Sequence, residues 1–139
     1  PIRTFSNVLY PDIAVVLDDN LLDMVNVTAN LKTGGLLVVN SARGPEELGV
    51  KGPYTVAVSD AFHSSEAAGL IVEGNVLIST SILGPFAAAS DLVSAENIRL
   101  AIGRKFKGAA LDRNLAALEL AYRNTRILRY ELPVASANA

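Results

Sequence analysis

Cysteine is absent from this 139-residue sequence, and histidine occurs once. The absence of cysteine excludes disulfides, thiolate zinc sites, cysteine-ligated iron–sulfur clusters and thiol nucleophiles within this chain. No pair of histidine or acidic residues has the spacing of metal ligands either, so we predict no metal site. The sequence therefore offers few of the side chains that an enzyme working alone requires.

Charged residues and long apolar runs are also sparse. Only 19% of the residues are charged and the net charge is −2, so no global positive field attracts nucleic acid or anionic lipid. No apolar run approaches the ~18–20 residues that a membrane span needs. There is no signal-peptide pattern. We expect a cytoplasmic protein with no nucleic-acid partner and no membrane span.

Apolar residues, in contrast, make up half of the sequence, and the mean hydropathy is +0.33. This content argues against disorder and is sufficient for a core in a chain of one-domain length. Without a membrane span, the excess apolar surface belongs to a core or to an interface. We predict a single domain over residues 1–139 that forms one piece of a larger assembly.

The order of the apolar patterns indicates the fold. The continuous apolar runs at 13–17 and 36–39 predict strands buried on both faces, as in a parallel sheet. Residues 54–58 are predicted to form a third strand. Residues 76–79 are interpreted as a short fourth strand, or as part of a hairpin that turns at Gly74-Asn75. Together with the helices described next, these strands predict a layered α/β fold, with a mainly parallel or mixed sheet flanked by helices and a helical C-terminal part.

Helical patterns fill most of the remaining sequence. We expect one helix to begin at Asp18 or Asp19 and to end at Gly34-Gly35, and another to begin at Ser59-Asp60. From residue 80 onward the pattern is helical, with Ser94 capping one helix. The last helix places its apolar residues on one stripe, namely Leu111, Leu115, Leu118 and Tyr122.

The polar residues give no catalytic motif. His63 stands beside Ser64, Ser65 and Glu66, but neighbours on one helix do not converge as a triad, and the sequence has no nucleophile elbow. We interpret His63 as a helix-surface residue.

Two aspartates follow strands, Asp18 and Asp60. The carboxyl ends of parallel strands are where ligands bind, which leaves open an independent α/β module for a small anionic ligand. Helix capping explains the same two positions. The first strand–helix junction has two acids and no glycine, which counts against a dinucleotide site.

One basic cluster is present, Arg104, Lys105 and Lys107. Cations at the end of a helix interact favourably with its dipole. The alternatives are a small anion site or an acidic partner.

A series of segments resembles, in order, the gamma subunit of 2-oxoacid:ferredoxin oxidoreductases, a family of the pyruvate synthase type. The segments are PIR at 1–3, PDIAVVLD at 11–18, LKTGGLLVVNS at 31–41, VSDA at 58–61, ILGPFA at 82–87 and LVS at 92–94. The resemblance runs along nearly the whole chain.

This resemblance implies a complex that oxidatively decarboxylates a 2-oxoacid, usually to an acyl-coenzyme A, and passes the electrons to ferredoxin or a related acceptor. In the family, alpha and beta subunits hold thiamine diphosphate, and a ferredoxin-like delta subunit holds [4Fe-4S] clusters. The gamma module packs against them near the entry of coenzyme A. The chain itself is then a non-catalytic subunit or fragment with no cofactor of its own, and the identity of the 2-oxoacid stays open.

The sequence departs from the family pattern at two places. The glycine-rich opening, of Gly-Arg-Gly-Gly-Gln-Gly type, is absent, and with it we expect the family's first strand and helix to be missing. Ser79 stands where many relatives carry Asn. The residues that we expect to face the complex, near its cofactors, are Arg3, Asn40 and Ser79. Each is equally explained as a hydrogen bonder at a loop or strand end.

Overall fold

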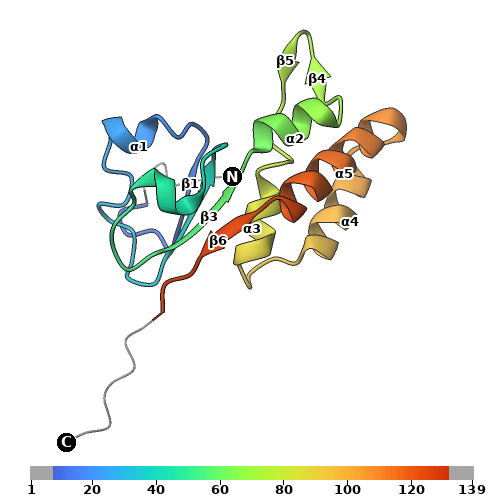
Figure 1. The fold of residues 1–139 in the computed structure, drawn as a ribbon. Helices are drawn as coiled ribbons and strands as arrows, with labels where there is room; N and C mark the ends of the chain where they lie inside the picture. Colours follow the sequence, from blue (N-terminus) through green and yellow to red (C-terminus); the bar gives the residue numbers. More distant parts are fainter. Residues whose placement is uncertain (1–7, 132–139) are drawn as a thin grey trace, which may run out of the picture.

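The computed structural model describes residues 8–131, in which a mixed sheet is flanked by helices (Figure 1). The sheet has the strand order β1-β2-β3-β6. Strands β1 (Ile13–Val16), β2 (Leu36–Asn40) and β3 (Thr55–Ser59) are parallel, and β6 (Arg126–Leu128) is antiparallel to β3. The predicted α/β fold is confirmed. β6 is not predicted from the sequence, because its three residues are too few to form a pattern.

The strands differ in burial as their places in the sheet require. β2 lies between two neighbours, and its residues Leu37, Val38 and Val39 are fully buried, as expected for a central parallel strand. β1 lies at the edge, and Val15 is 48% exposed. The prediction that β1 is buried like a central strand is therefore wrong, because an edge strand has a neighbour on one side only.

The connection from β1 to β2 contains little helix. Helix α1 covers only Leu21–Met24, so the prediction of a helix that reaches Gly34-Gly35 is wrong. Val25 has an extended backbone, and two β-branched residues follow it, at 27 and 28. β-Branched side chains lose rotamer freedom in a helix. The Thr28 hydroxyl also donates to the side chain of Asn26, a local bond that competes with helix formation.

Helices cover the two faces of the sheet unequally. The 3-10 helix η1 (Pro45–Leu48) and the turns around α1 pack on one face, with apolar side chains that include Leu22, Val27 and Leu48. The opposite face packs against α2 (Ala61–Ala67) and α3 (Leu83–Ala89). α4 (Ala95–Lys105) and α5 (Gly108–Arg123) form a further layer with α3 (Figure 1).

The caps of two helices agree with the sequence. The Asp60 carboxylate accepts a hydrogen bond from the His63 backbone N–H at 2.8 Å, and the Ser94 hydroxyl accepts one from the Asn97 N–H at 3.1 Å. Side chains of this kind satisfy backbone donors that have no partner within the helix. Capping therefore accounts for Asp60, as predicted.

Residues 71–76 form a hairpin that projects beyond α2 (Figure 1). Its strands are β4 (Ile71–Val72) and β5 (Asn75–Val76), which are antiparallel and separate from the main sheet. The two turn residues, Glu73 and Gly74, both have positive φ, at 50° and 79°. This is the turn geometry that matches the twist of a hairpin. The fourth-strand interpretation is wrong. The hairpin alternative is correct, but its turn lies at Glu73-Gly74, one residue before the expected Gly74-Asn75.

The buried stripe of α5 is rotated from the predicted one. Tyr122 is exposed, whereas Ala117, Leu118 and Ala121 are fully buried. Small residues on this stripe allow α3 to approach α5 closely at Gly84, where an added Cβ would lie 2.6 Å from the Tyr122 backbone nitrogen. Close packing of the two helices, more than the size of the side chains, determines which face of α5 is buried.

Candidate functional site

A hollow of about 430 Å³ lies where the three parallel strands end. Its walls are formed by the residues that close each strand or directly follow it, together with the start of α2 and the end of the hairpin. They are Leu17, Asp18, Asp19, Asn40, Ser41, Ala42, Asp60, Phe62, Val76 and Ile78. Open α/β sheets bind ligands outside the carboxyl ends of their strands. This hollow is therefore the first candidate for a site.

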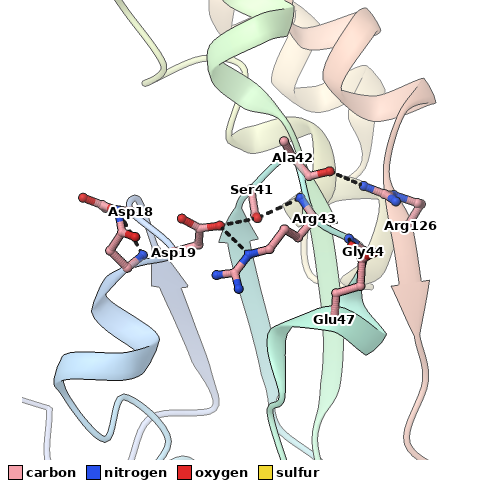
Figure 2. Close-up of polar contacts among 9 residues, drawn as sticks. Asp18, Asp19, Ser41, Ala42, Arg43, Gly44, Glu47 and Arg126 are labelled. Atoms are coloured by element: carbon pink, nitrogen blue, oxygen red, sulfur yellow. Dashed lines mark hydrogen bonds and ion pairs between the residues drawn. The ribbon is translucent and has the colours of Figure 1, made fainter.

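A polar link joins the turn after β1 to the loop after β2 (Figure 2). The buried hydroxyl of Ser41 donates to Oδ2 of Asp19 at 2.5 Å, and Nε of Arg43 donates to the same oxygen at 3.2 Å. The hydroxyl also accepts from the Arg43 backbone N–H at 3.0 Å. The hydrogen bond from Ser41 has the largest effect and lowers the pKa of the Asp19 carboxyl. Burial opposes it, and the hydrogen bond and the charge of Arg43 lower the pKa further.

The loop after β2 is fixed at further points in the same view (Figure 2). The Gly44 N–H donates to Oε2 of Glu47 at 2.6 Å, which closes the start of η1. Nη2 of Arg126, on β6, donates to the Ala42 carbonyl at 3.0 Å. One hydrogen bond between the loop and η1, and another from β6 at the far edge of the sheet, therefore fix the loop.

We expect Asp19→Asn to destabilise the chain by about 1–2 kcal/mol at pH 7, because the buried Ser41 hydroxyl then loses a charged acceptor. The lowered pKa of Asp19 gives a stabilisation that is present above the unfolded pKa of about 3.9 and is lost as pH falls through the folded pKa. The difference between the two proteins should therefore shrink below about pH 4. Urea denaturation across this pH range measures it.

Asp12→Asn is the matched control, since Asp12 pairs with Lys32 on the exposed surface. We expect it to change stability by less than about 0.5 kcal/mol. A difference between Asp19→Asn and the unmodified chain that stayed constant down to pH 2 would contradict the role given to Asp19.

Asn40, one of the residues expected to face the complex, holds backbone at this edge. Its Nδ2 donates to the Leu17 carbonyl at 3.1 Å, and its Oδ1 accepts from the Ala61 N–H at 2.9 Å. The amide therefore ties the end of β1 to the start of α2. Both the nitrogen and the oxygen of the amide are therefore hydrogen-bonded to the chain's own backbone.

The charge of the hollow limits what it can bind. Asp18, Asp19 and Asp60 bring three carboxylates to its wall, and Arg43 brings one guanidinium to the same edge. The Asp18 carboxylate accepts from the backbone N–H of Asn20 at 3.0 Å. A wall with this excess of negative charge disfavours a phosphate or a carboxylate.

The serine hydroxyls next to His63 in the sequence donate their hydrogen bonds to other groups. His63 is exposed on α2, as predicted, whereas Ser64 and Ser65 are buried. The Ser64 hydroxyl donates to the Asp60 carbonyl and the Ser65 hydroxyl to Ser81. Within residues 8–131, no group of three acidic or histidine side chains is placed to hold a metal ion. No helix in this range is long and apolar enough to cross a membrane.

Of the three residues expected to face the complex, the structure describes Asn40 and Ser79, and it places them at separate hollows. Ser79 is exposed and borders a different hollow, beside α4, whose wall includes Lys105 and Phe106. Arg3 lies outside the described residues. The hydrogen bond between Asp19 and Ser41 is not predicted from the sequence. Their positions just after neighbouring parallel strands are the signal that could have indicated it, because such strands end at the same edge.

Comparison with known proteins gives three kinds of match. Residues 1–124 match the family described as "Pyruvate ferredoxin/flavodoxin oxidoreductase". The chain is 39% identical over 135 residues to the pyruvate/ketoisovalerate oxidoreductases common subunit gamma of Thermococcus kodakarensis. That match covers 95% of this chain and 70% of the relative.

Further matches include proteins that carry the name PorC. The chain is 34% identical over 124 residues to the pyruvate synthase subunit PorC of Methanothermobacter marburgensis, a match that covers 88% of this chain and 64% of the relative. The crystal structure of the pyruvate oxidoreductase subunit PORC of Thermotoga maritima is similar with a TM-score of 0.69 at 26% identity. It covers 86% of this chain and 66% of that one, so the chain spans about two thirds of the length of these proteins.

Proposed function

Because this chain belongs to the pyruvate ferredoxin/flavodoxin oxidoreductase family, we propose that it is the gamma subunit, or the equivalent domain, of a cytoplasmic 2-oxoacid oxidoreductase complex. The match to the family over residues 1–124 is the observation that carries the proposal. The identity of 39% to a gamma subunit that serves pyruvate and ketoisovalerate oxidoreductases supports it.

Within such a complex the chain is a structural subunit formed by one domain. It has no cysteine to ligate an iron–sulfur cluster. The acidic hollow at the strand ends does not fit the pyrophosphate of thiamine diphosphate or the phosphates of coenzyme A. Other chains would hold these groups: alpha and beta subunits the thiamine diphosphate, and a ferredoxin-like delta subunit the clusters. No reaction step is assigned to a residue of this chain.

Within residues 8–131, β1 pairs with a strand on its β2 side only, and this free edge of the sheet supports association with another polypeptide. Val15, Val38 and Ala57 are paired across β1, β2 and β3 and thus form one apolar row on the face that α2 and α3 cover. Val38 and Ala57 are fully buried, but Val15, at the β1 end of the row, is 48% exposed. Leu17 beyond it is 53% exposed. Apolar surface that continues a buried row to an unpaired strand is typical of an interface.

The independent anion-binding module is the less favoured function. Its ligand would meet the three aspartates at the strand ends, and the guanidinium of Arg43 is already paired with one of them. The side-chain amide of Asn40 is already hydrogen-bonded to the backbone of two segments.

We propose that Ser79 and Arg3, more than Asn40, face the interior of the complex, since the Ser79 side chain lies on the surface.

The test is co-expression of this chain with alpha, beta and delta chains of a pyruvate oxidoreductase. We expect one complex that contains all four chains and reduces ferredoxin when pyruvate and coenzyme A are supplied. A chain that purified alone as a stable monomer, while the other three formed a fully active enzyme, would contradict the proposal.

A further inference from the structure

A second hollow, of about 280 Å³, lies between α4 and the segment that leads into α3. Its wall is mainly apolar and includes Leu83, Ile98, Ile102 and Phe106. Thr80 also lines it, but its hydroxyl donates to Oδ1 of Asn114 at 2.6 Å in the interior. The hollow therefore presents apolar surface with little polar chemistry.

Lys105 lines this hollow, and two further cations, Arg104 and Lys107, are close to it in the sequence. Arg104, Lys105 and Lys107 are exposed, and no salt bridge joins them to a carboxylate within residues 8–131. Residues 100–111 contain no acidic residue, although the whole chain has a net charge of −2. Nζ of Lys105 lies 5.7 Å from the centre of the Phe106 ring. Lys105 thus belongs both to the cation cluster and to the wall of the hollow.

The helix dipole alone does not explain this arrangement. It favours cations near the end of α4, but it does not require an apolar hollow beside them. The hollow is smaller than the roughly 300–1,000 Å³ of typical small-molecule sites. Its size suits one apolar side chain.

We propose that this surface docks an acidic segment of a partner protein, with one apolar side chain of that segment seated in the hollow. Charge complementarity selects the occupant: acidic residues of the segment pair with the three unpaired cations, and the apolar side chain covers Ile98 and Phe106. The concave apolar floor favours a protruding side chain over the flat surface of a lipid bilayer. The inference concerns this chain alone and does not depend on the proposed function.

The test uses the full chain and a short synthetic peptide of glutamates around one phenylalanine. We expect saturable binding, with amide NMR shifts that concentrate at Ala101 and Phe106. Lys105→Glu combined with Lys107→Glu should weaken binding about tenfold or more, since it replaces attraction by repulsion. Ala101→Trp should weaken it by filling the hollow at unchanged charge. Lys51→Glu, the same change on an exposed lysine in another loop, should leave the affinity within about twofold.

Four results would overturn the inference. The first is that the chain shows no binding at about 1 mM peptide. The second is that the double lysine variant binds as well as the unmodified chain. A peptide with alanine in place of phenylalanine would bind equally, which would leave only non-specific charge attraction. Vesicles rich in phosphatidylserine would bind where the peptide does not. Co-expression tests the subunit proposal separately, and neither result decides the other.

Discussion

Gly84→Ala is expected to cost the chain about 2–3 kcal/mol of its free energy of unfolding. The new Cβ would lie 2.6 Å from the backbone nitrogen of Tyr122 and 2.9 Å from the carbonyl carbon of Ala121. Backbone atoms of a neighbouring helix cannot move aside as a flexible side chain can. α3 and α5 would have to separate, which would disturb the layer that covers the sheet.

Thermal and urea denaturation followed by circular dichroism measure this change. Domains of this size have total stabilities of about 5–15 kcal/mol, so the loss should lower Tm by about 6–12 °C. The matched control is Gly103→Ala on the exposed side of α4, where an added Cβ meets no atom within 4 Å. It should stabilise the chain by about 0.5–1 kcal/mol, because alanine favours the helix. Equal stability of Gly84→Ala and the unmodified chain would refute the close helix contact.

Val15→Glu combined with Leu17→Glu is expected to prevent assembly with the other chains while the fold persists. Both side chains are about half exposed, at 48% and 53%, so the substitutions cost the isolated chain little. In a complex, the same positions would bury two carboxylates against apolar surface, which costs several kcal/mol unless each finds a partner. We expect co-elution with the alpha, beta and delta chains to fall by more than tenfold.

The control for this pair is Leu92→Glu, at a 74% exposed leucine before α4. It adds the same type of charge away from the free edge of β1 and should leave assembly intact. Normal co-elution of the Val15 and Leu17 double variant would show that the β1 edge is not the interface. Loss of assembly by all three substitutions would point to a general effect of added charge.

The sequence predicted the architecture well where a local pattern decides it. The apolar run of β2 and the caps at Asp60 and Ser94 are local signals, and the structure agrees with all three. The sequence predicted the structure less well where it depends on contacts between distant parts of the chain. Whether β1 lies at an edge depends on which strands pair with it, and β6 forms only because it meets β3.

The candidate site shows the same division. Asn40 is expected to face the complex because it lies at the end of a segment that resembles the family. Its two hydrogen-bond partners, the Leu17 carbonyl and the Ala61 N–H, are 23 and 21 residues away. The basic cluster of residues 104–107 was visible in the sequence, whereas the apolar hollow beside it requires Leu83 to lie against α4. The resemblance to gamma subunits could be seen because it is spread over many segments in order. It is confirmed by the family match.

The most direct test of the central claim is pyruvate-dependent ferredoxin reduction by the co-expressed chains, compared with the same preparation made without this chain. We expect all four chains to elute together and activity to require this chain in the complex, whereas the chain alone should show none. Full activity without it, with this chain eluting as a separate monomer, would show that it is not a subunit of the enzyme.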